Sequence, residues 1–170
     1  VDYAELERYY CEAEELIGVA GPEDAGARWR SRKYPLPPHP LSYAAKTLGK
    51  GAKALGLGWQ ANSRAALSQA WNGRPPCNYC GACLKGCPRG DKGSTDVTFI
   101  HGAISTGRCA IRPLSPVIRI EAGRDDRIVA VLVGRTDGSI ERIACANLVL
   151  ACGAVETPRL LLASDGLANE

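Results

Sequence analysis

Methionine is absent from all 170 residues of the chain, the initiator position included. The first residues, from Val1 to Leu16, form a charged amphipathic pattern and lack the apolar centre of a signal peptide. Both features indicate an internal fragment of a longer protein. Long apolar runs are absent too, and none approaches the roughly 20 residues that a membrane-spanning helix needs. We therefore expect a soluble chain.

An excess of either charge is also missing. Lys and Arg number 21, Asp and Glu number 18, and the basic residues are scattered rather than gathered into a stripe. Nucleic acid is therefore excluded as an expected partner. Apolar residues make up 45% of the chain, which is enough to bury a core. The length suits one domain or a piece of a larger one.

Cysteine, by contrast, is abundant. Four of the eight cysteines lie in one short segment that ends in Pro88: Cys77, Cys80, Cys83 and Cys87. Their spacing of two, two and three intervening residues before a proline is that of the bacterial iron–sulfur run. Disulfide-rich scaffolds spread their cysteines to close loops, so such a framework is not indicated. Free thiols, isolated disulfides and a zinc site remain open, although zinc usually takes two separated cysteine pairs.

The first half of the chain predicts two helices joined by an extended segment. Apolar residues recur at helical spacing over residues 3–17, and Gly18 should end that helix. The proline-rich residues 34–40 cannot continue a helix or enter a central strand. Residues 41–55 return to helical composition, and residues 58–66 predict a short strand.

The second half predicts strands. Residues 109–121, 127–134 and 139–145 form an antiparallel meander, with a hairpin turn at Asp137 and Gly138. Residues 148–152 are apolar without alternation, as in a strand buried in a parallel sheet. A glycine turn follows, and Thr157 and Pro158 should cap and begin a helix that ends at Gly166. The fold class is therefore α/β.

One segment carries a specific resemblance. Residues 146–162 resemble the second flavin-contacting segment of the glucose-methanol-choline (GMC) oxidoreductases. Residues 9–21, 34–40 and 77–103 resemble the cysteine-bearing subgroup that includes gluconate dehydrogenase and FAD-dependent glucose dehydrogenase flavoprotein subunits. The resemblance implies the central fragment of an FAD/NAD(P)-binding fold. Residues 1–110 would be a helical, cysteine-rich connecting region, and residues 111–170 would be part of the FAD-binding domain.

The resemblance also implies a cofactor and residues that bind it. FAD would accept a hydride from the CH–OH group of a sugar or another alcohol. The backbone at Val117 would meet the adenine, although a plain core valine is the alternative. The residues on the diphosphate side would be Ala151, Cys152, Gly153 and Ala154. We expect Cys152 to be a small buried residue that contributes its backbone rather than its thiol.

Parts of the family pattern are not found in these residues. The Gly-x-Gly-x-x-Gly fingerprint and the catalytic histidine pair of the family lie outside the chain. Neither His39 nor His101 stands in the catalytic motif, so neither is expected to act as a base. No catalytic residue is assigned, and the fragment alone should be inactive.

In the resembling glucose dehydrogenases, three cysteines hold a three-iron [3Fe-4S] cluster. The matching positions are Cys77, Cys83 and Cys87, and Cys80 is a spare thiol or the extra ligand of a [4Fe-4S] cluster. Such a cluster would pass electrons singly to a cytochrome or small subunit, in a periplasmic or inner-membrane-associated enzyme. The alternatives are a ferredoxin-like electron-transfer module without substrate chemistry and a zinc-stabilised interaction domain.

Overall fold

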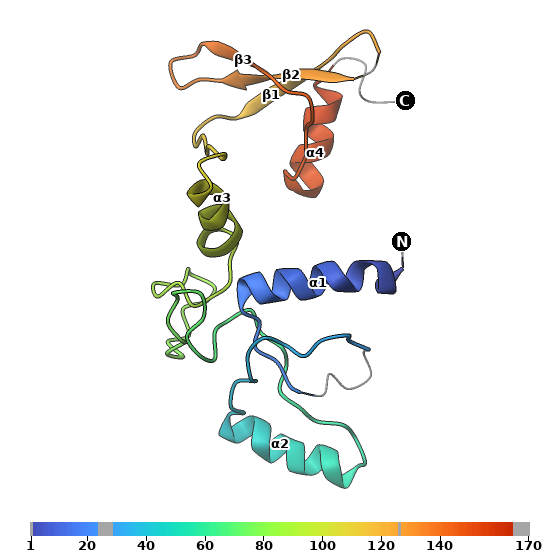
Figure 1. Cartoon of the computed structure of the whole chain (residues 1–170), viewed down its shortest axis with the longest axis vertical. Coiled ribbons are helices and arrows are strands. Elements are labelled where there is room, and N and C mark those ends of the chain that lie inside the picture. The colour runs from blue at the N-terminus through green and yellow to red at the C-terminus, as the bar shows by residue number, and fades with distance from the viewer. Residues whose placement is uncertain (1, 24–28, 126, 165–170) are drawn as a thin grey trace. The chain divides into compact units, whose positions relative to one another are not determined.

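The computed structural model describes residues 2–23, 29–125 and 127–164. The chain divides into two compact units, Val1–Cys109 and Ala110–Glu170 (Figure 1). No helix of the described residues is long and apolar enough to cross a membrane.

The first unit contains few regular elements. Its helices are α1 (Tyr3–Ile17), α2 (Tyr43–Ala54), the π-helical turn η1 (Asp96–Ile100) and α3 (His101–Ser105). The prediction of a helix over residues 3–17 is confirmed, and the helix predicted over residues 41–55 forms over slightly fewer residues. Asp2 caps α1 by accepting a hydrogen bond from the Glu5 N–H at 2.9 Å.

Gly18 ends α1 in the left-handed conformation, with φ 79°, and its N–H donates to the Glu14 carbonyl at 2.8 Å. A Cβ at this position would lie 2.5 Å from Leu67 Cδ2 and 2.7 Å from Trp71 Cδ1. Glycine is therefore required both for the turn and for the close approach of the next segment.

The core of this unit is small, and its residues come from loops rather than from helices or strands. Ala20, Leu36 and Leu67 are buried, and Trp71 packs against them. Leu36 is held in the proline-rich segment because its N–H donates to the Val19 carbonyl at 3.2 Å and its carbonyl accepts from Gly21. Extended backbone is thus fixed here by single bridges rather than by a sheet.

The prediction that residues 58–66 contain a short strand is wrong. Arg64 pairs with Ala20 and Ala66 pairs with Lys92, but each is an isolated bridge. The backbone of this stretch changes partners after one residue, so no continuous ladder forms.

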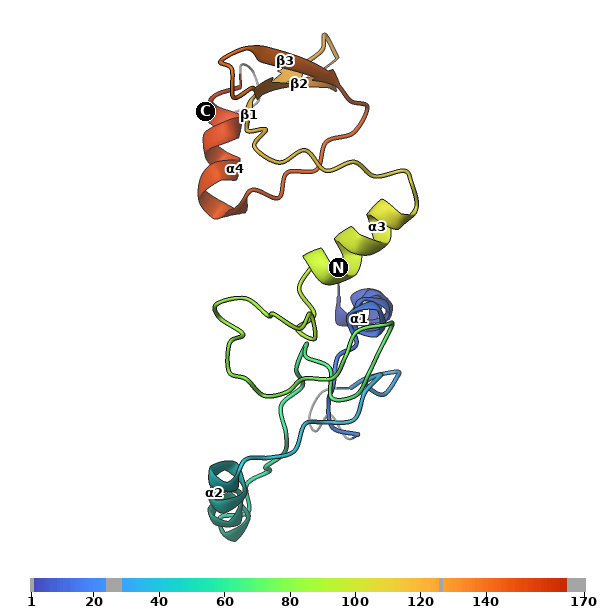
Figure 2. The same ribbon diagram turned by 90° about the vertical axis from the view of Figure 1, so that its left-hand side faces the viewer.

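The second unit is a three-stranded antiparallel sheet in the order β1-β2-β3, with one helix against it (Figure 2). Its elements are β1 (Val117–Ala122), β2 (Ile128–Gly134), β3 (Ile140–Ala144) and α4 (Gly153–Leu162). The meander is confirmed, and so is the Asp137-Gly138 hairpin turn, where Gly138 has φ 83°. The first strand begins at Val117 rather than at residue 109 because Pro113 and Pro116 cannot donate to a ladder.

The core of the second unit lies between α4 and the sheet. Leu160 of α4 is buried against three strand residues, Ile120, Val131 and Val133. Ser164 is also buried: its hydroxyl accepts from the Ile120 N–H at 2.9 Å and donates to the Leu160 carbonyl at 2.6 Å. A backbone group of β1 is thereby tied to the end of α4.

Two predictions for this unit are wrong. Residues 148–152 form no strand in the described structure, because the antiparallel sheet offers no parallel neighbour for their backbone groups. α4 begins at Gly153 rather than at Pro158, so the proline lies inside the helix. Gly153 has φ 83° and turns the chain directly into the helix, which makes the cap predicted at Thr157 unnecessary. The end predicted at Gly166 lies outside the described residues.

Candidate functional site

The cysteine run lies in a loop without helix or strand. The Cys77 N–H donates to the carbonyl of buried Leu67 at 2.8 Å, and the Leu67 N–H donates to the Asp91 carbonyl at 3.2 Å. Both ends of the loop are therefore tied to one core residue. Between them the loop surrounds a cavity of about 160 Å³, lined by all four cysteines together with His39, Arg64, Ala66, Tyr79, Gly81 and Asp91.

Asp91 is the buried carboxylate of this cavity, with 2% of its surface exposed. The Cys87 thiol donates to Asp91 Oδ1 at 3.1 Å. Burial acts to raise the Asp91 pKa, but hydrogen bonds from the Cys87 and Cys77 thiols outweigh it, and the pKa is lowered. Burial raises the pKa of Cys77, the hydrogen bond from the Tyr79 N–H acts to lower it, and contact with Asp91 raises it further. The raised pKa disfavours the thiolate, the form that would ligate a metal.

The four cysteines share a cavity without converging on a point. In the described part of the chain, no three His, Cys, Asp or Glu side chains are placed to hold a metal ion. A structural zinc ion needs four ligands arranged tetrahedrally, with sulfurs at about 2.3 Å, so the observed arrangement does not fit zinc. An iron–sulfur cluster is held by cysteine thiolates, so the type of donor around this cavity matches that group, but in the described residues the four sulfurs are not gathered into its ligand set either.

His39 and Tyr79 belong to the cavity and were missed by sequence reasoning about the cysteines. His39 is 7% exposed, and its Nε2 lies 2.8 Å from the Ala66 carbonyl oxygen. A carbonyl only accepts, so Nε2 carries the proton and donates. Nδ1 lies 3.0 Å from the Tyr79 hydroxyl. The available signal was a histidine flanked by Pro38 and Pro40, which is fixed in position by its neighbours.

The residues predicted to bind FAD lie in the other unit. Val117 is the half-buried first residue of β1, pairs with Val133, and packs against the core; a register shift separates it from Arg119. Residues 151–154 form the exposed entry to α4, where Cys152 is the N-terminal flanking residue. The expectation that Cys152 is buried is wrong, because residues 148–152 are not enclosed by a sheet. The flavin roles of these residues stay predictions.

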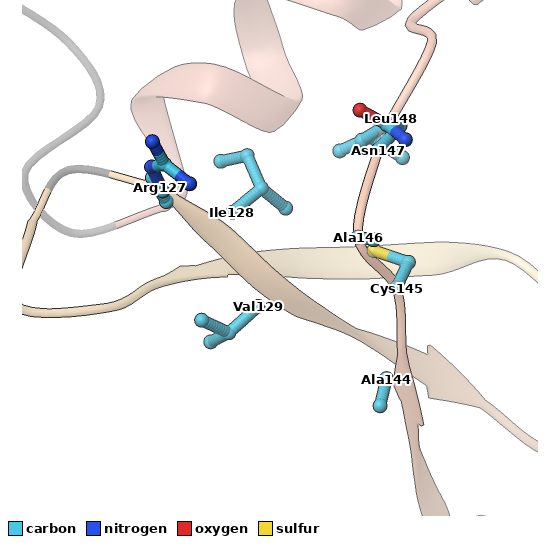
Figure 3. Close-up of a pocket in the computed structure, with 8 residues that line it drawn as sticks. All are labelled: Arg127, Ile128, Val129, Ala144, Cys145, Ala146, Asn147 and Leu148. Atoms are coloured by element: carbon cyan, nitrogen blue, oxygen red, sulfur yellow. The ribbon is translucent and has the colours of Figure 1, made fainter.

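A wide pocket of about 770 Å³ lies beside the segment that leads to α4 (Figure 3). Figure 3 shows Ile128 and Val129 pointing to opposite sides of β2, as neighbours in a strand do. The wall opposite is formed by the end of β3 and the following segment: Ala144, Cys145, Ala146, Asn147 and Leu148. The pocket thus includes the first residues of the segment 146–162 that resembles a flavin-contacting one, but not residues 151–154.

The chain is similar to known proteins over almost its whole length. The chain is 30% identical over 180 residues to the fructose dehydrogenase large subunit of Gluconobacter japonicus, which covers 99% of this chain and 32% of that protein. It is 29% identical over 174 residues to 6'''-hydroxyparomomycin C oxidase of Streptomyces lividus, covering 98% of this chain and 32% of the relative.

Paromamine 6'-oxidase of Streptomyces fradiae is 29% identical over 166 residues, covering 96% of this chain and 29% of that protein. All three relatives are named as oxidases or dehydrogenases, which are oxidoreductases. The family model described as GMC oxidoreductase matches residues 2–170. The chain belongs to the GMC oxidoreductase family, and the resemblance seen in the sequence is confirmed. It spans about a third of the length of these relatives.

Proposed function

We propose that this chain is part of an FAD-dependent dehydrogenase that oxidises the CH–OH group of a sugar or another alcohol. The observation that carries the proposal is the family match over residues 2–170. Relatives named for fructose and for paromamine support a polyhydroxylated substrate. The bound flavin would supply the acceptor for the hydride, and the backbone at Val117 and residues 151–154 would bind it.

The start of α4 suits such a role. The first N–H groups of a helix have no partner inside the helix and carry the positive end of its dipole, so they attract phosphate. Gly153 and Ala154 occupy this first turn, and neither has a side chain large enough to block a close approach. The backbone N–H groups, rather than the Cys152 thiol, would therefore contribute most to binding the diphosphate.

The cysteine loop extends the proposal. Cys77, Cys83 and Cys87 would hold an iron–sulfur cluster that releases electrons one at a time to a cytochrome or a small subunit. Cys80 lines the same cavity, and it would be either a spare thiol or a fourth ligand. The acceptor would lie in the periplasm or at the inner membrane, as in the cysteine-bearing subgroup. A ferredoxin-like module has no comparable support, because the family match also includes the meander and α4.

The test uses the full-length protein, purified without oxygen. We expect about one flavin per chain, as absorbance and after extraction, together with iron and acid-labile sulfide. Flavin that is reduced by an alcohol or sugar supports the dehydrogenase, and a preparation without flavin would contradict it. Flavin without iron would remove only the cluster.

Single serine substitutions then separate the cysteines. Cys77→Ser, Cys83→Ser and Cys87→Ser should lose iron, while Cys109→Ser, an exposed cysteine beyond the loop, should keep it. Cys80→Ser distinguishes a [3Fe-4S] cluster from a [4Fe-4S] cluster. Unchanged iron in this variant favours three ligands, and lost iron favours four.

A further inference from the structure

We propose that the outer side of the cysteine loop is a docking surface for a redox protein with an acidic face. This loop surface consists of Leu84 and three cations of the same loop, Lys85, Arg89 and Lys92. The role of the partner as an electron acceptor rests on the proposed function. The exposure and the charge of the loop surface do not depend on it.

Leu84 is the apolar centre of the loop surface. The Lys85 N–H donates to the Ala82 carbonyl at 2.9 Å, so Cys83 and Leu84 are the two central residues of a tight turn. The Leu84 side chain is fully exposed, at 101%. One exposed leucine is ordinary on a protein surface and indicates nothing by itself. Its position matters here because it directly follows a cysteine that lines the cavity.

The cavity is also closest to solvent on this side. Cys80 and Cys83 are exposed, whereas Cys77 and Cys87 are half-buried. A partner that covers Leu84 therefore lies next to an exposed cysteine of the run. No deeper approach to the cavity is needed for the partner to come close to a group that the cysteines hold.

Positive charge accompanies the leucine. The Lys92 ammonium group donates to the Cys83 carbonyl at 2.9 Å, which places its charge beside the turn. Arg89 is exposed, and its Nη2 lies 3.4 Å from the Pro76 carbonyl oxygen at the start of the loop. Among the described residues, none pairs with the exposed Lys85 ammonium group. The loop surface is thus a small apolar centre with cations on the same loop.

The sequence around the loop offers few carboxylates to neutralise these cations. The chain has 18 Asp and Glu residues, yet none of them stands in residues 25–90. Asp91 comes next, but its side chain is 2% exposed and accepts from the Cys87 thiol. Its charge is therefore directed into the cavity rather than toward a partner.

The next carboxylate along the chain is exposed Asp96. Its pKa is lowered first by a hydrogen bond with Ser94 and, among weaker causes, by the charge of Lys92. Asp96 thus offsets part of the Lys92 charge. Lys85 and Arg89 are left as the cations that should attract a partner most strongly.

An acidic redox protein fits the loop surface better than a membrane does. Cations around an apolar centre complement carboxylates around the redox centre of another protein, and this complementarity steers association. A membrane-binding segment instead presents the whole apolar face of a helix, whereas the loop surface has one leucine on a turn. Each encounter would pass one electron to the partner. Two encounters would remove the two electrons of one hydride, and its proton would go to water.

Binding of a model partner to the full-length protein tests the loop surface without depending on turnover. Cytochrome b5, an acidic haem protein, should bind in isothermal titration calorimetry, and mitochondrial cytochrome c, a basic one, should not. The affinity for cytochrome b5 should fall about tenfold or more between about 20 mM and about 200 mM salt. Lys85→Glu and Arg89→Glu should each weaken binding about three- to thirtyfold at the lower salt concentration.

Two further variants separate charge from apolar contact. Leu84→Ser should weaken binding about tenfold at both salt concentrations, because salt does not screen an apolar contact. Lys53→Glu, in the last turn of α2, makes the same change of net charge on another element and should alter the affinity less than about twofold. Flavin and iron contents equal to those of the wild type show that a variant keeps its loop intact.

The outcomes for the loop surface and for the proposed function are distinct. Absent binding of cytochrome b5 at low salt, or binding that Lys85→Glu and Arg89→Glu leave unchanged, would overturn the inference even if the protein contains flavin and iron. A protein without iron would contradict the cluster, yet weaker binding in the Lys85, Arg89 and Leu84 variants would still support the loop surface. Binding to phosphatidylglycerol vesicles that Lys85→Glu abolishes, without binding of cytochrome b5, would identify a membrane contact and overturn the inference.

Discussion

Among the residues that the structure describes, Val1–Cys109 buries three polar or charged side chains, Glu7, His39 and Asp91, whereas Ala110–Glu170 buries one, Ser164. The described part of the first unit has helices and isolated bridges, and its buried polar groups tie loops to one another and to α1. The second unit has a sheet whose apolar face is covered by α4. Polar contacts that depend on protonation therefore support the unit with the cysteines, and apolar packing supports the unit with the predicted flavin segment.

The comparison of the two units predicts that Ile120→Ala causes the largest loss of stability. Ile120 is 2% exposed and lies between the sheet and α4. Removing its side chain should lower the opening free energy of the second unit by about 2–5 kcal/mol. Peptide-resolved hydrogen exchange on the full-length protein measures this, and Arg124→Ala, in an exposed turn, is the control. Equal loss of protection in α1 would contradict the distinction between the units.

Gly18→Ala should have the next largest effect, in the first unit. The new methyl group would meet Leu67 and Trp71 in addition to enforcing an unfavourable φ. The two costs together should be about 2–4 kcal/mol. Gly56→Ala provides the match, because Gly56 has φ 70° with open space around it and should show only the backbone cost of about 1–2 kcal/mol. Urea unfolding of both variants measures the difference, and equal losses would show that the close approach contributes nothing.

Glu7→Gln should change how stability depends on pH. The Glu7 carboxylate accepts from the Ser31 hydroxyl at 2.6 Å, the Cys11 thiol at 3.0 Å and the Ser31 N–H at 2.9 Å. These hydrogen bonds, led by that from the Ser31 hydroxyl, lower its pKa to about 2 from 4.5. The resulting stabilisation is fully present above the unfolded pKa and is lost as pH falls from about 4.5 to about 2.

The melting temperature of the wild type should therefore fall more steeply over this pH range than that of Glu7→Gln. Glu12→Gln, an exposed position on the same helix, should keep the wild-type slope. Parallel curves for the wild type and Glu7→Gln would argue that Glu7 is not a charged, hydrogen-bonded group in the folded protein.

Ser164→Ala should have the smallest effect. It leaves the Ile120 N–H without its acceptor but removes little apolar volume. We expect a loss of about 1–2 kcal/mol, confined to β1 and the end of α4. Ser164→Thr, which retains the hydroxyl, should recover part of the protection measured by hydrogen exchange. A loss as large as that of Ile120→Ala would mean that polar contacts matter equally in both units.

Much of the local structure was predictable from sequence. α1 follows from helical spacing with Asp2 and Gly18 at its ends, and the hairpin follows from Asp137 and Gly138. These signals act over a few residues, so they need no knowledge of distant partners. The four cysteines lie around one cavity, as their close spacing in the sequence favours, and their role as ligands stays a prediction.

Features that depend on distant partners were not predictable. Residues 148–152 have a strand composition, but a strand exists only where a neighbour offers its backbone. His39 and Tyr79 are 40 positions apart, and their contact comes from the path of the extended segment. The role of Asp91 was not predictable either, because it depends on its burial and on its hydrogen bond from the Cys87 thiol.

Pro158 gives α4 unequal mechanical properties along its length. It has no N–H to donate to the Ala154 carbonyl, so the first turn lacks one of its usual internal bonds. The other end is clamped to β1 by Leu160 and Ser164. α4 therefore has a free first turn, where the flavin diphosphate is proposed to bind, and an anchored end, where Leu160 and Ser164 hold it to β1. A phosphate that binds the free end would stiffen it, and the slowing of amide exchange in that turn would report occupancy directly.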